Sequence, residues 1–106
     1  VRSFRAARYY AAGMNALDRG DSAVAIAELE RAAALMPSAS EIQNHLGLAY
    51  WSDGREDAAL GALERAVELD CDNDAARVNL ARLRFERAAR RANDGASDER
   101  STSNGG

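Results

Sequence analysis

His45 and Cys71 are the side chains of this sequence whose types could form a nucleophilic pair. A cysteine thiolate becomes an effective nucleophile when a neighbouring imidazole takes up its proton, which requires the two groups within hydrogen-bond reach. The chain holds one histidine and one cysteine, and they fall on different predicted elements, a helix and a turn. We therefore expect no enzyme, with Cys71 an ordinary thiol in a turn.

The other residue types that bind metals or cofactors also lack a suitable pattern. A single histidine cannot supply the paired imidazole ligands common in zinc sites. No GxxxxGK phosphate loop occurs, and Gly13 and Gly47 lie inside predicted helices. The carboxylates are spread over positions expected to face solvent. We therefore predict no catalytic residue, no metal and no cofactor.

The sequence repeats itself at an interval of 34 residues. The block Leu29-Glu30-Arg31-Ala32 returns as Leu63-Glu64-Arg65-Ala66. The same shift aligns Gly13 with Gly47, Gly20 with Gly54, Ala25 with Ala59, and Leu35 with Leu69. A fixed period of this length is typical of stacked supersecondary units that bury a shared core.

Local signals predict that each unit is a pair of helices. Gly20, Pro37 and Gly54 interrupt long runs of helix-forming residues, and Gly95 suits a helix end. Asp21 or Ser22 can cap one helix and Asp72 another. The predicted helices span residues 3–18, 22–36, 56–69 and 74–92, and a further helix ends at about residue 52. This helix is expected to begin at Ser38-x-x-Glu41, which has the spacing of a capping box. Residues 93–106 are small, polar and charged, and we expect them to form a disordered tail.

On these residues the chain resembles the tetratricopeptide repeat family. The resemblance covers residues 6 to about 92. In the first repeat it rests on Tyr9-x-x-Ala12-Gly13, Gly20, Ala25-x-x-x-Leu29, Ala32 and Pro37. In the second it rests on Leu46-Gly47-x-x-Tyr50, Gly54, Ala59-x-x-x-Leu63 and Ala66. Gln43 and Cys71 depart from the pattern, because the family usually has a large aromatic residue and a second proline there.

The resemblance implies an all-α, right-handed superhelix of helix hairpins. Its domain would span residues 1–92, with repeats at about 6–39 and 40–73 and a C-terminal capping helix at 74–92. Arg77 and Arg84 occupy positions that would otherwise pack against a further helix, and arginine suits a wet outer face.

The resemblance also implies a concave groove that binds a partner protein, as an adaptor or scaffold. The groove would contain Tyr10, Met14, Leu17, Asn44, His45, Leu48, Trp51, Val78, Asn79, Arg82 and Phe85. Any one of the apolar members could instead belong to the core. Family members that bind the acidic tails of chaperones use a clamp that includes lysine, and this chain has none. We therefore expect an apolar or amphipathic partner segment.

Charge is distributed unevenly and leaves a second function open. Residues 1–20 sum to +3, residues 21–74 to −9 and residues 75–92 to +5, within a net charge of −3. The basic last helix could bind nucleic acid or an anionic membrane, but we favour the simpler interpretation, a solvated capping helix whose arginines interact with the helix dipole. Basic ends and an acidic middle could also promote weak self-association. Regulation within a larger protein is a further alternative.

The expected location is soluble, with the cytoplasm favoured. No apolar run approaches the roughly 20 residues that span a bilayer. Val1 opens the sequence, so a cell-envelope location stays open if a signal or anchor has been removed.

Overall fold

The computed structural model describes the backbone of residues 2–104 and the side chains of residues 3–95. This part of the chain consists of helices and contains no strand, which confirms the predicted all-α class. The helices are α1 (Arg2–Asp18), α2 (Ser22–Leu35), α3 (Ser40–Ser52), α4 (Glu56–Leu69) and α5 (Asp74–Asn104).

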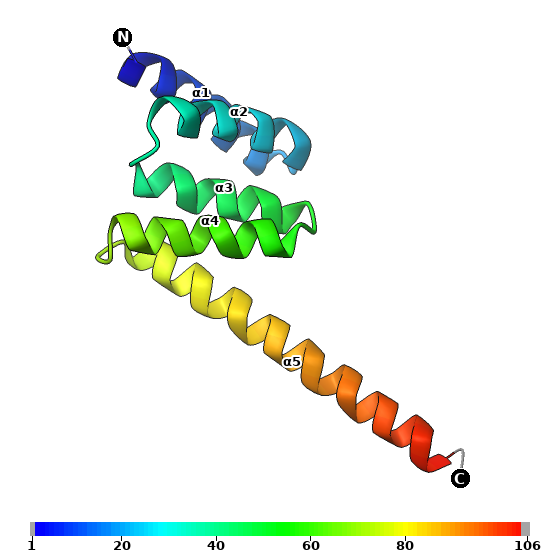
Figure 1. Cartoon of the computed structure of the whole chain (residues 1–106). Coiled ribbons are helices and arrows are strands. Elements are labelled where there is room, and N and C mark those ends of the chain that lie inside the picture. Colours follow the sequence, from blue (N-terminus) through cyan, green and yellow to red (C-terminus); the bar gives the residue numbers. More distant parts are fainter. Residues whose placement is uncertain (1, 105–106) are drawn as a thin grey trace.

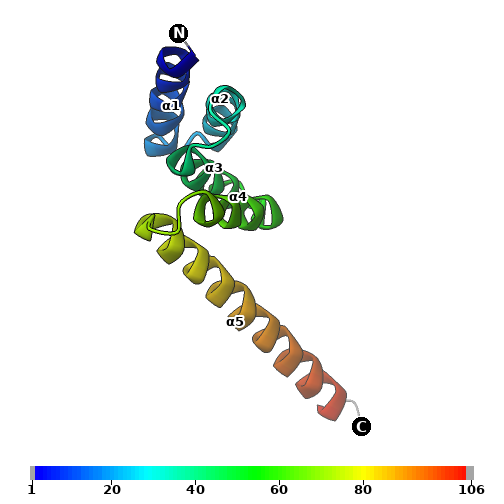
Figure 2. The same cartoon turned by 60° about the vertical axis from the view of Figure 1, so that its left-hand side comes forward.

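The helices form an open stack in which each one packs on the next along the chain (Figure 1). α1 and α2 make one antiparallel hairpin, α3 and α4 make a second, and the start of α5 lies against α4. α5 then runs away from the stack, as both views show (Figures 1 and 2). The molecule is accordingly elongated, with extents of 67 × 28 × 18 Å.

The core is built from alanine and leucine. Leu29, Leu63 and Leu83 are the largest side chains that are fully buried. Leu29 and Leu63 are equivalent positions of the two hairpins, and each lies against a glycine of the partner helix. A Cβ atom placed on Gly13 would lie 2.6 Å from Leu29 Cγ, and one on Gly47 would lie 2.8 Å from Leu63 Cγ. The glycines thus allow both hairpins to close tightly.

The turns within the hairpins follow the expected chemistry. Gly20 and Gly54 have φ angles of +76° and +79°, a region that glycine adopts without a steric penalty. Asp21 caps α2 because its Oδ1 accepts a hydrogen bond from the amide of Val24. Both turns are as predicted, and of the two predicted caps, Asp21 and Ser22, the structure uses Asp21. The capping box predicted at Ser38 is not formed, because α3 begins at Ser40 and its N-cap residue, Ala39, makes no side-chain hydrogen bond.

The beginning of α5 differs from the expected one. Asn73 supplies the cap instead of Asp72, since its Oδ1 accepts a hydrogen bond from the Ala76 amide at 3.1 Å. Asn73 Nδ2 also donates to Ser40 Oγ, whose hydroxyl donates to the carbonyl oxygen of Ala66. This network joins the start of α3, the end of α4 and the start of α5.

The end of α5 also differs from the expected one. The sequence predicted a helix ending at about Ala92 and a disordered tail over 93–106, whereas α5 continues to Asn104. Gly95 does not adopt the positive φ that ends a helix. A single glycine costs only about 1 kcal/mol inside a helix, so Gly95 alone does not end α5. Residues 105–106 lie outside the described part.

Candidate functional site

Four of the expected groove residues meet in one depression between α3 and α5. Leu48 and Trp51 contribute from α3, and Asn79 and Arg82 from α5; Ser52 completes the lining of a space of about 240 Å³. Leu48, Trp51 and Asn79 are half-buried, whereas Arg82 is exposed. An apolar floor therefore meets polar groups at its rim.

Arg82 and Trp51 interact directly across this depression. The guanidinium carbon of Arg82 lies 5.7 Å from the centre of the Trp51 ring, within the range of a cation–π contact. Arg82 Nε also lies 3.4 Å from Glu86 Oε1. Because its carboxylate partner is on the same exposed helix surface, the guanidinium stays available to another acceptor.

Asn44 differs from the expectation that it lies open in the groove. Its side chain is buried, with 4% exposed, and its Oδ1 accepts a hydrogen bond of 3.0 Å from Asn79 Nδ2. A buried amide needs such a partner, because an unpaired one costs about 1–3 kcal/mol. Asn44 thus orients Asn79, and only Asn79 reaches the surface of the depression.

A second pair of expected groove residues meets between α1 and α3. Tyr10 Oη lies 2.9 Å from His45 Nδ1, and the two rings pack edge to face with centres 5.3 Å apart. His45 Nδ1 also lies 2.8 Å from the carbonyl oxygen of Glu41. Partial burial, and then the nearby Glu41 charge, raise the pKa of the Tyr10 hydroxyl above its ordinary value. The phenol therefore remains a neutral hydrogen-bonding group at physiological pH.

The remaining expected groove residues are less closely connected. Met14 and Leu17 are half-buried on α1, and Leu17 packs against the core. Val78 and Phe85 are 64% and 74% exposed on α5. Neither residue lines the depression between α3 and α5.

The two residues that could have formed a nucleophilic pair have other surroundings. His45 Nδ1 is in contact with Tyr10 and the Glu41 carbonyl, and Cys71 is exposed in the turn between α4 and α5. No hydrogen bond joins them in the described part of the chain. In the same residues, no helix is long and apolar enough to cross a membrane.

Comparison with protein families gives a match over residues 10–76, to the family described as Tetratricopeptide repeat. The chain belongs to the tetratricopeptide repeat family. Tetratricopeptide repeats generally mediate protein–protein interactions and are typically non-catalytic. A comparison with curated proteins finds no significant match.

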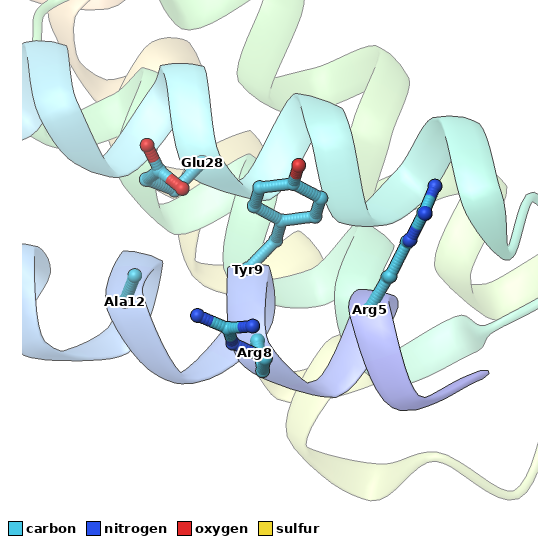
Figure 3. Close-up of a pocket in the computed structure, with 5 residues that line it drawn as sticks. All are labelled: Arg5, Arg8, Tyr9, Ala12 and Glu28. Carbon is cyan, nitrogen blue, oxygen red and sulfur yellow. The ribbon is translucent and has the colours of Figure 1, made fainter. Parts of the chain in front are cut away.

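In this tetratricopeptide repeat protein, the sequence did not indicate a depression that lies on the first hairpin. It lies between α1 and α2, has a volume of about 290 Å³, and is lined by Arg5, Arg8, Tyr9, Ala12 and Glu28 (Figure 3). The available signal was the Arg5-x-x-Arg8 spacing, which places two guanidiniums on one face of a helix. In the sequence, the two arginines contribute to the charge of +3 over residues 1–20.

Proposed function

We propose that the chain is a non-catalytic binding module that holds a partner protein segment in its concave groove, as an adaptor or scaffold. The repeats would span residues of about 6–39 and 40–73, with residues 74–92 as a capping helix. The observation that carries the proposal is the depression of Leu48, Trp51, Asn79 and Arg82, because it combines apolar contact area with oriented polar groups.

The residue types of this depression suit an apolar or amphipathic segment. Leu48 and the Trp51 ring offer a surface for an apolar side chain, and tryptophan and arginine are enriched among residues that dominate binding energy. Asn79 and Arg82 offer hydrogen bonds to carbonyl or carboxylate oxygens of the segment. Tyr10, Met14, Leu17 and His45 would extend the contact along α1 and α3, and Val78 and Phe85 along α5.

The alternative of binding nucleic acid or an anionic membrane through the last helix has weaker support. Among the arginines of α5, Arg77 pairs with Asp74, Arg87 with Asp57, and Arg90 with Glu56. Arg84 and Arg91 form no ion pair in the described part of the chain. Each pair reduces the charge that a phosphate would meet. A salt-sensitive affinity for DNA, RNA or anionic vesicles would instead favour this alternative.

Trp51 makes the groove testable with an intrinsic probe, because it is the one tryptophan of the chain. Peptides selected from a random display library against the wild-type protein are expected to change the Trp51 fluorescence as they bind. Arg82→Gln should weaken these peptides about tenfold, since a hydrogen bond to a charged group contributes about 1.5–3 kcal/mol. Arg77→Gln is the matched control on the same helix and should leave binding unchanged.

Replacing Trp51 itself tests the apolar part of the groove. Trp51→Ala is expected to weaken the same peptides by about 2 kcal/mol or more, measured by calorimetry, while far-UV circular dichroism shows nearly unchanged helix content. Loss of the helical signal would show that Trp51 is required for the core. Equal binding by wild type, Trp51→Ala and Arg82→Gln would refute the groove.

A further inference from the structure

The depression between α1 and α2 has a composition that differs from the groove. Tyr9 points from α1 toward α2, Arg5 rises beside it, Arg8 lies below it along α1, and Glu28 lies on α2 on the side of Tyr9 away from Arg5 (Figure 3). None of its lining residues belongs to the groove. Its volume of about 290 Å³ is at the lower limit of small-molecule pockets, which span about 300–1,000 Å³. A group the size of one side chain therefore suits it better than a nucleotide.

The charge of this depression is unusual in an acidic chain. Arg5 and Arg8 are exposed, and neither forms an ion pair with another residue in the described part of the chain. The carboxylate of Glu28 is already paired, because Arg31 Nη1 lies 2.9 Å from its Oε1. The Arg31 guanidinium lies over the Tyr9 ring, 5.8 Å from its centre. Three arginines and one glutamate leave a local charge of +2 around Tyr9.

This arrangement matches a doubly charged anion. We propose that the depression binds a phosphomonoester dianion, carried by a phosphorylated side chain of a partner protein. A phosphoryl group has three strong acceptor oxygens and a charge near −2 at neutral pH, which two unpaired guanidiniums can neutralise. The guanidinium fork binds such oxygens in a bidentate manner. Tyr9 and Ala12 supply a wall for the atoms that link the phosphoryl group to its peptide.

Glu28 makes the site selective rather than generally anion-binding. Its carboxylate lies on the α2 side of the depression, so it repels a ligand whose negative charge spreads beyond Arg5 and Arg8. Arg5 and Arg8 are exposed on α1, so both side chains can turn toward a compact dianion bound on the α1 side. A carboxylate or sulfate ester has one charge and leaves one guanidinium unpaired.

The first test uses phenyl phosphate as the probe, with phenyl sulfate and benzoate as singly charged analogues. Nuclear magnetic resonance shifts of the Arg5 and Arg8 side-chain Nε–H groups are expected to identify the site. Phenyl phosphate should bind about tenfold more tightly than either analogue at pH near 7.5, because it pairs with a second guanidinium. Its affinity should fall roughly tenfold near pH 5, since the second phosphate pKa is about 6.

Two double variants with the same change in net charge separate a specific site from general electrostatics. Arg5→Gln with Arg8→Gln should abolish the binding of phenyl phosphate. Arg84→Gln with Arg91→Gln, two exposed arginines on α5, should leave it unchanged. All four side chains are exposed, so both variants should retain wild-type circular dichroism. Equal losses in the two variants, or equal affinities for the three probes, would overturn the proposal.

The source of the phosphoryl group is tested with peptides. A phosphotyrosine peptide should bind more tightly than inorganic phosphate, because its ring and backbone contact Tyr9 and Ala12. The unphosphorylated peptide and a version with glutamate in place of phosphotyrosine should bind at least tenfold more weakly. Binding of inorganic phosphate without binding of the peptide would overturn the assignment to a protein ligand, and equal binding of the glutamate peptide would overturn the dianion.

Discussion

Replacing Gly47 by alanine tests whether the second hairpin depends on close contact between α3 and α4. The added Cβ would lie 2.8 Å from Leu63 Cγ and 3.3 Å from the carbonyl oxygen of Ala59. Leu63 is fully buried and has no solvent to move into, and the Ala59 oxygen belongs to the backbone of α4. The two helices must therefore separate.

Two opposing effects set the magnitude. Inserting a methyl group into a well-packed core costs about 1–3 kcal/mol. Alanine has a better helix propensity than glycine, which stabilises the variant by about 1 kcal/mol. The expected net loss for Gly47→Ala is about 0–2 kcal/mol. Gly13→Ala should behave in the same way, because its Cβ would lie 2.6 Å from Leu29 Cγ.

Gly61→Ala provides the matched control. Gly61 lies on α4, and nothing lies within 4 Å of a Cβ atom placed there, so only the propensity gain of about 1 kcal/mol applies. The two variants should then differ by about 1–3 kcal/mol, at about 4–8 °C in Tm for each kcal/mol in a domain of this size. Urea and thermal unfolding followed by circular dichroism measure the difference. Equal stability of Gly47→Ala and Gly61→Ala would refute the packing argument.

Two further substitutions test the contacts of α5. Asn73→Ala should lower the free energy of unfolding, measured in urea, by about 1–2 kcal/mol, because the cap of α5 and the hydrogen bond to Ser40 are both lost. The stability of Asn73→Asp should lie between those of wild type and Asn73→Ala, since a carboxylate accepts a hydrogen bond from the Ala76 amide but cannot donate one to Ser40. The hydrogen bond from Arg90 lowers the pKa of Glu56 below its ordinary value of 4.5. The ionised Glu56 therefore contributes fully to stability above pH 4.5, and this contribution is lost as the pH falls through the lower pKa of the folded state. Thermal unfolding of Glu56→Gln should therefore depend less on pH than that of wild type in this acidic range, and parallel profiles would contradict the assignment.

The helical hairpins could be predicted from sequence because their signals are local. Gly20 and Gly54 mark turns that require a positive φ, and the interval between Leu29 and Leu63 reports which positions share the same packing. The tetratricopeptide repeat family was identified on these residues. The spacing of Leu48 and Trp51 on one helix face was likewise enough to place them in one depression.

Features set by contacts between distant segments could not be predicted in the same way. Asp72 and Asn73 are both good caps, and the choice of Asn73 depends on Ser40, a residue of another helix. Asn44 is buried because Asn79 of α5 lies beside it, which its own neighbours in sequence do not indicate. The depression at Tyr9 forms only where α2 packs against α1. The sequence around Arg5 and Arg8 therefore did not indicate that both line a depression.

The open stacking of the helices has a consequence for how the molecule comes apart. α1 and α5 are each supported mainly from one side, whereas α2, α3 and α4 each lie between two neighbouring helices. Cooperative units of a linear array open from the least supported end. Backbone amides should therefore exchange with deuterium fastest in α5 beyond Leu83 and slowest where α2 meets α3. The ends of the stack open more often than its middle.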